Sequence, residues 1–336
     1  MKATVRKIAE QYQVSPATVS LVLNDKPGVR PATRERIARA LIQNGYQIKK
    51  KDQKRKIQYI CYQSSSWFAE RPDGFYTYVT EGLDRGCKRY NAALSLTYAN
   101  SGNLQKLISL AVTEGSDGII FLGTEYSHEA IPEFLDFEIP IVVVDNPIFE
   151  SRINSIYPDD YVGIDETVKY LKQLGHKDIG FITIEGTFGE LFNREQIWRR
   201  VILHNGLQVN EEHVLHLEPV MTEARRQIAE YVQSGTAMPT AFLIVNDVIA
   251  ASVVSAMTQN GIRVPEDISI IGYDDSSICE ITTPNLTSIR SDVASMGEMA
   301  VRRLMQLIEN KDEPYMKQML ATHLVIRDSV GKPGVR

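Results

Sequence analysis

From residue 57 onward, short apolar runs rich in β-branched residues alternate with longer amphipathic stretches. Such alternation predicts a parallel sheet with helices on both faces, because parallel strands need long crossover connections. The pattern is too long for one sheet, so we expect two doubly wound sheets, with the chain crossing between them near 158–160. The expected strands are 57–62, 94–98, 118–122, 140–145, 153–157, 179–184, 213–217, 241–245, 268–271, 286–290 and 321–326. The expected helices are 76–90, 104–112, 129–134, 162–174, 248–260 and 296–308.

The first 46 residues follow another pattern, typical of three short helices. Val5 and Ile8 begin an apolar face at helical spacing, directly after Thr4, which can cap the helix. Ser15 followed by Pro16 is a strong start for a second helix. Helices this short are not stable alone, so a small bundle is expected. The spacing alone fits either a bundle without a ligand or a DNA-binding helix-turn-helix.

The second and third helices of this bundle have recognisable cores and ends. Val19 and Leu23 lie one turn apart and are expected to face inward. A third helix is expected over 31–44; it lacks a good cap at Arg30 and stops at Gly45.

The charge is distributed unevenly along the chain. Residues 1–56 contain 14 Lys and Arg and four acidic residues, a net charge of +10, whereas the remainder contains 23 basic and 38 acidic residues, a net charge of −15. A small basic domain on an acidic body is typical of a nucleic-acid-binding protein, and it favours the DNA-binding interpretation of the bundle.

Short motifs in the first 46 residues resemble the N-terminal headpiece of the lactose/galactose-repressor (LacI/GalR) family. The matching residues are Ile8-Ala9, Val14-Ser15-Pro16-Ala17-Thr18-Val19-Ser20, Val22-Leu23-Asn24, Thr33-Arg34 and Gly45-Tyr46. This motif is far more specific than a generic helix-turn-helix.

The resemblance implies DNA-contacting roles by position. The residues that match phosphate-contacting positions are Thr4, Ser15, Thr18, Ser20, Asn24, Thr33 and Tyr46. The residues that match base-reading positions of the recognition helix are Pro16, Ala17 and Leu21. Many family members have arginine where this chain has Leu21, and leucine offers only apolar contact, which suits a thymine methyl. The half-site is therefore expected to differ from that of arginine-bearing relatives.

Residues 47–56 form the expected linker, and there the resemblance fails. Family members commonly have a hinge helix with alanine and a leucine that wedges into the minor groove. This linker has six Lys and Arg in ten positions and neither alanine nor leucine. Like charges favour extension, which predicts a basic tether that follows phosphates without kinking the DNA.

The body, 57–330, resembles the effector-binding domain of the same family, itself similar to periplasmic sugar-binding proteins. The matching segments are 117–120, 139–142, 174–176, 246–247, Gly261 with Val264-Pro265, 272–275 and 284–287. The expected fold is therefore α/β: a small all-α headpiece, 1–46, and a body of two doubly wound parallel-sheet subdomains. The expected subdomains are 57–158 with 291–319, and 159–290 with 320–330.

Ligands of such sheets bind where strands end, in the cleft between the subdomains. The residues that match effector-contacting positions are Phe75, Tyr76, Asp145, Arg194, Asn246 and Asp274. Taken singly, each acidic residue is better explained as a helix cap or a surface charge. Together, carboxylate, amide and guanidinium groups suit vicinal hydroxyls. Segment 218–221 lacks the aromatic residue of many sugar-responsive members. We expect a small polar effector, a sugar or sugar phosphate, with a nucleobase or nucleoside as the alternative.

Catalysis has little support in this sequence. There is no Gly-rich phosphate loop, nucleophile elbow or HExxH motif, so no enzyme activity, cofactor or metal is expected. His176 follows a turn and is expected to hydrogen-bond backbone. The three isolated cysteines, the charged N-terminus and the lack of an apolar run of about 20 residues predict a cytoplasmic protein without membrane association.

Two functional classes fit these patterns. The first is a ligand-responsive DNA-binding regulator, a repressor that binds a two-fold symmetric operator as a homodimer, because one headpiece reads only a half-site. The second is a solute-binding protein of the periplasmic type that does not bind DNA. The basic headpiece and the absence of an export signal favour the repressor.

Overall fold

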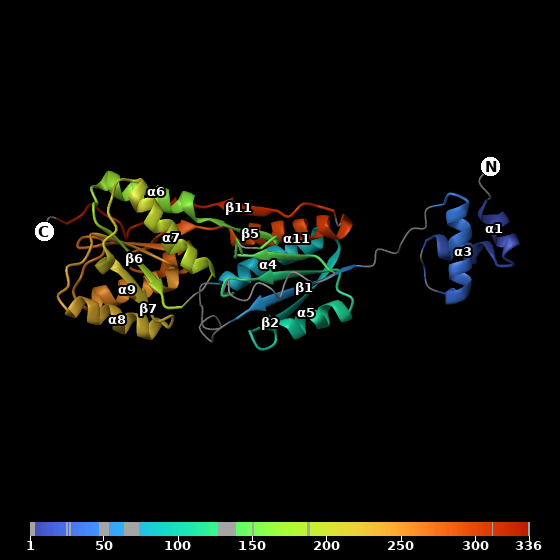
Figure 1. Cartoon of the computed structure of the whole chain (residues 1–336), viewed down its shortest axis with the longest axis horizontal. Coiled ribbons are helices and arrows are strands. Elements are labelled where there is room, and N and C mark those ends of the chain that lie inside the picture. Colours follow the sequence, from blue (N-terminus) through green and yellow to red (C-terminus); the bar gives the residue numbers. More distant parts are fainter. Residues whose placement is uncertain are drawn as a thin grey trace. The chain divides into compact units, whose positions relative to one another are not determined.

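The computed structural model describes residues 4–24, 26, 28–46, 54–63, 74–126, 139–149, 151–186, 189–310 and 312–334, with backbone only at 189–192. The chain divides into two units, Met1–Arg55 and Lys56–Arg336 (Figure 1). Most of the expected linker, 47–53, and the expected helix 129–134 lie outside the described residues. No helix in the described ranges is long and apolar enough to cross a membrane.

The first unit is a three-helix bundle, as predicted. Its helices are α1 (Val5–Gln11), α2 (Pro16–Leu23) and α3 (Pro31–Gln43). The bundle core comprises Ile8, Ala9, Val19, Val22, Ile37, Ala40 and Leu41. On α2, Val19 and Val22 are the buried residues. Leu23, which was expected to face inward, is only partly buried against the same core.

The ends of α3 follow the expected chemistry. Arg30 makes no side-chain cap hydrogen bond, so the helix begins at Pro31 without a cap. Gly45 adopts a φ of 72° after the helix, and the Tyr46 N–H donates to the Leu41 carbonyl over 2.9 Å. A left-handed residue is needed to close a helix in this way, which explains a glycine at this position.

The second unit contains two six-stranded sheets, which define two subdomains. In the first sheet the order is β11-β5-β4-β3-β1-β2. Its strands are β1 (Arg55–Tyr62), β2 (Ala92–Ala99), β3 (Gly118–Leu122), β4 (Ile141–Val144), β5 (Asn154–Asp159) and β11 (Lys317–Ala321). Helices α4 (Phe75–Arg89) and α11 (Val293–Glu309) pack on one face, and α5 (Leu104–Thr113) packs on the other.

The second sheet has the order β12-β10-β9-β8-β6-β7. Its strands are β6 (Ile179–Ile184), β7 (Val214–Leu217), β8 (Ala241–Ile244), β9 (Ser269–Asp274), β10 (Thr287–Arg290) and β12 (His323–Val325). Its helices are α6 (Asp160–Leu174), α7 (Gly189–His204), α8 (Met221–Gln233), α9 (Asp247–Gln259) and the short α10 (Ile278–Ile281). Among the pairings β6–β7, β6–β8, β8–β9, β9–β10 and β10–β12, only β12 is antiparallel to its neighbour. The α/β fold with two parallel-sheet subdomains is thus confirmed.

The chain crosses between the subdomains at three crossing segments. The first joins β5 to α6 at Asp159 and Asp160, and the second joins β10 to α11 at 291–292. The third is Thr322, between β11 and β12. The Thr322 hydroxyl donates to the Asp159 carbonyl over 2.7 Å and accepts from the Gly163 N–H over 3.0 Å, so the first and third crossings are tied together.

Two predicted boundaries are wrong by a few residues. The expected strand 321–326 is two strands in different sheets, because β11 continues to Ala321 beside β5 and the chain turns into the second sheet at Thr322. The expected subdomain boundary between 319 and 320 therefore moves to Thr322. The first strand begins at Arg55 instead of Ile57, since the Lys56 N–H donates to the Asp117 carboxylate over 2.8 Å. Lys56, expected to lie in the linker, already pairs with the segment before β3, since the Asp117 N–H donates to the Lys56 carbonyl over 2.8 Å.

Candidate functional site

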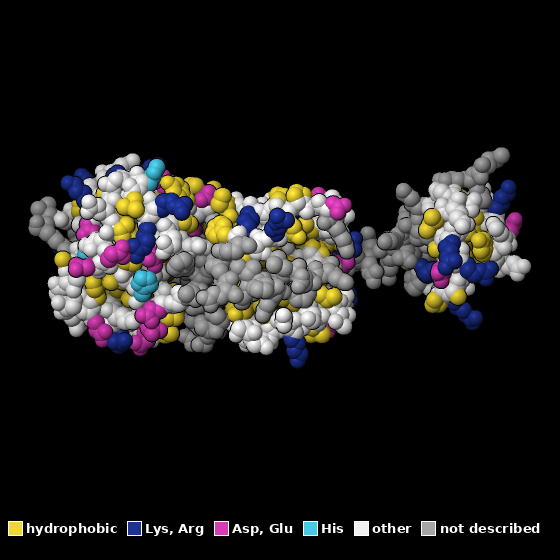
Figure 2. Space-filling model, in the orientation of Figure 1, with side chains coloured by type: hydrophobic (Ala, Val, Ile, Leu, Met, Phe, Trp, Pro, Cys, Tyr) yellow, Lys and Arg dark blue, Asp and Glu magenta, His cyan; other side chains and the backbone are white. Residues whose placement is uncertain are grey.

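The exposed side of α2 carries most of the residues predicted to contact DNA. Ser15 is the N-cap of the helix; its hydroxyl accepts from the Thr18 N–H over 3.0 Å and lies 2.8 Å from the Thr18 hydroxyl. Pro16, Ala17 and Ser20 are exposed on the same helix. Figure 2 shows several Lys and Arg side chains on the visible face of this three-helix unit.

The remaining headpiece residues vary in exposure. Thr4 caps α1, and the Asn24 amide donates to the Ser20 carbonyl over 2.9 Å. Thr33 is half-buried. Leu21 and Tyr46 are also half-buried, and Tyr46 packs against the bundle core. Thr4, Ser15 and Ser20 are therefore the exposed polar residues of the predicted set.

The predicted effector residues lie where strands of the two sheets end. Asp145 follows β4 with a left-handed φ of 60°, and Asp274 ends β9 with a φ of 105°. Asn246 follows β8 and caps α9, while Arg194 lies in the first turns of α7. Arg194 and Asp274 both act electrostatically on Asp145, so the fold brings these three residues together.

Asp145 is almost completely buried, 4% exposed, and accepts a 2.6 Å hydrogen bond from the Thr124 hydroxyl. Burial raises the pKa of its carboxyl to about 7; the Thr124 hydrogen bond and Arg194 oppose the rise, and the neighbouring charges of Asp274 and Asp160 add to it. A carboxyl with a pKa near 7 is present in both its protonated and its ionised form at neutral pH. It can therefore donate a hydrogen bond to a ligand hydroxyl or accept one from it.

Arg194 is held on several sides. Its guanidinium donates to the Val245 carbonyl over 2.6 Å, pairs with buried Asp160 at 3.4 Å, and stacks 3.5 Å from the ring centroid of Tyr273. The Tyr273 hydroxyl donates to Asp160 in turn. Sequence reasoning missed Asp160 and Tyr273 as members of this group; the available signals were the position of Asp160 at the crossing between the subdomains and the place of Tyr273 in the matching segment 272–275.

Asn246 has an incompletely satisfied amide. Its side-chain oxygen accepts from the Ile249 N–H over 2.9 Å, which caps α9. Its Nδ2 is buried and has no hydrogen-bond partner among the residues that the structure describes. Buried donors are almost always satisfied, so this amide is positioned to meet a ligand.

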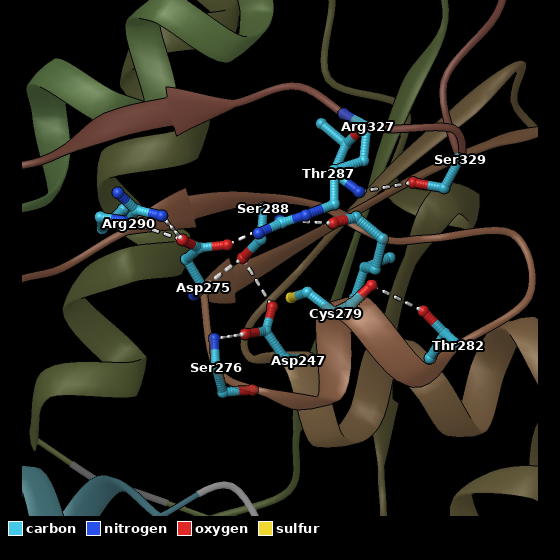
Figure 3. A network of polar contacts seen from close by, with 11 residues as sticks. Asp247, Asp275, Ser276, Cys279, Thr282, Thr287, Ser288, Arg290, Arg327 and Ser329 are labelled. Atoms are coloured by element: carbon cyan, nitrogen blue, oxygen red, sulfur yellow. Dashed lines mark hydrogen bonds and ion pairs between the residues drawn. The ribbon is translucent and has the colours of Figure 1, made fainter.

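The Asp274 turn rests on a buried polar network that the sequence did not predict (Figure 3). Asp247 accepts from the Ser288 hydroxyl over 2.6 Å and from the Ser276 N–H over 2.7 Å. Burial raises the pKa of Asp247 to about 7, and Asp274 adds to the rise. Beside it, Asp275 pairs with Arg290 and with Arg327, each at a closest distance of 2.6 Å or less. The network fixes two successive left-handed residues, Asp274 and Asp275.

The predicted aromatic pair lies at the start of α4. Phe75 is 5% exposed and belongs to the hydrophobic core, while Tyr76 is half-buried and meets it edge-on, with ring centroids 5.7 Å apart. Tyr76 is thus the more accessible ring of the two. Glu125, a buried carboxyl next to Thr124, is a further group near the end of β3 that sequence reasoning missed.

His176 bonds as expected, with Nε2 2.9 Å from the Gly331 carbonyl and Nδ1 2.8 Å from the Thr240 hydroxyl. Among the described residues, no group of three or more His, Cys, Asp or Glu could hold a metal ion.

Comparison with known proteins gives two family matches and relatives over the full length. Residues 4–48 match the bacterial regulatory proteins of the lacI family, and residues 168–330 match a periplasmic binding protein-like domain. The HTH-type transcriptional repressor PurR of Vibrio parahaemolyticus is 29% identical, covering 98% of this chain and 99% of its own. The ribose operon repressor of Haemophilus influenzae is 27% identical, covering 98% of each.

Solved structures share the fold over almost the whole chain. The lac repressor dimer bound to operator and the anti-inducer ONPF has a TM-score of 0.74 at 23% identity, covering 98% of this chain and 100% of that one. The complex of the transcriptional regulator CelR with cellobiose has a TM-score of 0.72 at 24% identity, covering 97% and 99%.

Proposed function

The chain belongs to the lacI family of DNA-binding transcriptional repressors, and we propose that a small polar effector, a sugar or sugar phosphate, controls its affinity for operator DNA. The observation that carries the proposal is the buried Nδ2 of Asn246, which has no partner among the described residues and lies beside a group of charged residues at strand ends. A repressor acts by binding, so the proposed role requires no catalysis, cofactor or metal, and it is exercised in the cytoplasm.

On the DNA side, repressors of this family bind operators as dimers, as in the solved lac repressor dimer with operator. We assign phosphate contacts to the polar residues of the headpiece and base contacts to Pro16, Ala17 and Leu21. The exposure of Pro16 and Ala17 at the start of α2 supports the base contacts, since the N-terminal part of a recognition helix meets base edges.

On the effector side, the proposed contacts are Asp145, Arg194, Asn246, Asp274 and Tyr76. A ribose operon repressor and a regulator bound to cellobiose among the similar proteins favour a sugar. The half-buried ring of Tyr76 makes a nucleobase or nucleoside the second candidate, because an aromatic face can stack on a planar base.

Effector binding would be coupled to operator binding because the effector lies between the two subdomains. A ligand that contacts Asp145 in one subdomain and Asp274 in the other favours one relative orientation of the two. That orientation would alter headpiece spacing in the dimer, and operator binding would change effector affinity by the same factor.

Two measurements test the proposal. Thermal-shift screening of the full chain against sugars, sugar phosphates and nucleosides should find a stabilising compound, since a ligand bound to the folded state raises Tm. The same compound should change affinity for an operator selected from random DNA, and the direction of the change distinguishes inducer from co-repressor. Asn246→Ala should reduce the ligand-induced shift, whereas Asn260→Ala, at the other end of α9, should not. Failure to select any DNA, or equal stabilisation of both variants, would contradict the proposal.

A further inference from the structure

A separate cavity of about 340 Å³ lies beside the first crossing segment. Its walls come from both subdomains: Pro147 and Phe149 after β4 and Met319 on β11 on one side, and α7 on the other. Residues 157–161 of the crossing segment complete the lining. The volume lies in the range of small-molecule sites.

Four polar side chains in this lining have no partner in the described part of the chain. Asp159, Asn193, Gln196 and Arg200 line the cavity, and the side chain of none of them forms a hydrogen bond or ion pair with any described residue. Asp159 occupies the N-cap position of α6, where a carboxylate normally accepts from the helix, but it makes no cap hydrogen bond. The Asn193 Nδ2 is buried and has no hydrogen-bond partner within the described ranges. One anion, one cation and two amides thus remain available around one cavity.

The rest of the lining is apolar. Phe149 and Tyr157 meet edge-on, with ring centroids 6.2 Å apart, and Ile197 belongs to the lining on the side of α7. Phe149 and Met319 are each 58% exposed, which is high for large apolar side chains. Apolar side chains this exposed beside a cavity are typical of a ligand site.

We propose that this cavity binds a free α-amino acid with an apolar or aromatic side chain. Arg200 suits the ligand carboxylate, because a guanidinium binds carboxylates through two parallel hydrogen bonds. Asp159 suits the ligand ammonium, Asn193 and Gln196 supply further donors and acceptors, and the aromatic wall takes the side chain. Opposite charges on the two sides make a zwitterion a better match than an anion or a cation alone.

The cavity is distinct from the proposed effector site, although the two are neighbours. On α7, residues 193, 196, 197 and 200 recur at helical spacing and form the face that lines the cavity. Arg194, Trp198 and Val201 are buried on another face of the helix. Asp160 lies in the wall between the two sites, with its carboxylate paired to Arg194 and Tyr273.

A ligand in this cavity would contact both subdomains and the crossing segment at once. It would therefore favour the subdomain orientation in which the cavity is formed, and its binding would be coupled to that of the effector and of operator DNA. The cavity would act as a second regulatory site.

Direct binding to the full chain tests the proposal with named probes: L-phenylalanine, L-tyrosine, L-leucine and L-methionine, measured by thermal shift and calorimetry. At least one should raise Tm by about 2 °C or more at millimolar concentration, since a ligand that binds only the folded state stabilises it by mass action. Phenethylamine and 3-phenylpropionate lack the carboxylate and the amine respectively, and each should bind at least tenfold more weakly than L-phenylalanine. The absence of binding by all four amino acids would overturn the proposal.

Matched variants locate the site. Arg200→Gln and Asp159→Asn should each weaken amino-acid binding at least tenfold, while Arg225→Gln, an exposed cation on α8, should leave it unchanged. Asn246→Ala should also leave it unchanged. If Asn246→Ala abolishes amino-acid binding and Arg200→Gln does not, the amino acid occupies the effector site. The proposal of a second site is then wrong, whereas the proposed function as a ligand-controlled repressor still stands.

Discussion

Asp145 combines burial with three charged neighbours, and this has a consequence for stability. Its pKa is raised from 3.8 to about 7, mainly by burial. Because the folded-state pKa lies above the unfolded value, the folded state binds the proton more tightly. The stabilisation from this group is complete below about pH 4 and is lost as pH rises through 7. Asp247, also raised to about 7, acts in the same direction.

Asp145→Asn should therefore flatten the pH dependence of unfolding. Asparagine resembles the protonated carboxyl and can still accept from Thr124, so the fall in Tm between pH 5 and pH 8 should shrink by several degrees. Thermal unfolding followed by circular dichroism at both pH values measures this. Asp312→Asn, at an exposed position, serves as the control. A Tm profile identical to wild type would show that Asp145 ionises freely in the folded state.

Leu21 is the residue on which the operator preference is expected to depend. Leu21→Arg should change the preferred half-site, because arginine adds bidentate recognition of guanine worth about 1–3 kcal/mol at one base pair. Selection from a random-operator library measures the change. Leu203→Arg, at an exposed position on α7, should select the wild-type sequence. If Leu21→Arg also selects the wild-type half-site, position 21 does not read bases.

At the scale of elements, α4 and α11 pack unusually closely. A Cβ built on Gly82 would lie 1.9 Å from the Ala294 carbonyl oxygen, a contact that no side chain can make. Gly82→Ala should therefore force the helices apart and destabilise the fold by about 1–3 kcal/mol, measured by urea unfolding. Gly102→Ala, where the nearest atom is 3.4 Å from the new Cβ, should have little effect. Equal stability of the two variants would contradict the close packing.

Most strands and helices were predictable because they depend on local pattern, whereas α8 was not predicted. Apolar runs gave the strands, and Ser15-Pro16 gave the start of α2. The positions of Asp145 and Asp274 at strand ends followed from the parallel arrangement. Contacts between distant segments have no local signal: the Asp160 and Tyr273 side chains meet although they lie 113 residues apart in the sequence. The third crossing at Thr322 was misplaced for the same reason, since a tertiary contact with Asp159 decides it.

At the scale of the whole molecule, the charge of the linker should determine how operator affinity depends on salt. Residues 47–54, which precede β1, carry four basic groups. Each phosphate neutralised contributes about −0.9 to the slope of log K against log salt concentration. A basic tether in each protomer of a dimer would therefore add substantially to the slope without adding sequence preference.

Replacing Lys49, Lys50 and Lys51 with glutamine removes six charges from a dimer. The slope between 50 and 200 mM salt should become shallower by up to about 5, with the selected operator sequence unchanged. Glutamine at Lys106, Lys177 and Lys332, which are exposed lysines of the body, removes the same charge away from the linker and should leave the slope intact. A circular-permutation assay on the wild type should detect no strong operator bend, because the linker lacks a leucine to wedge between base pairs. A strong bend with an unchanged slope would mean that the linker deforms DNA like a hinge helix instead of following its phosphates.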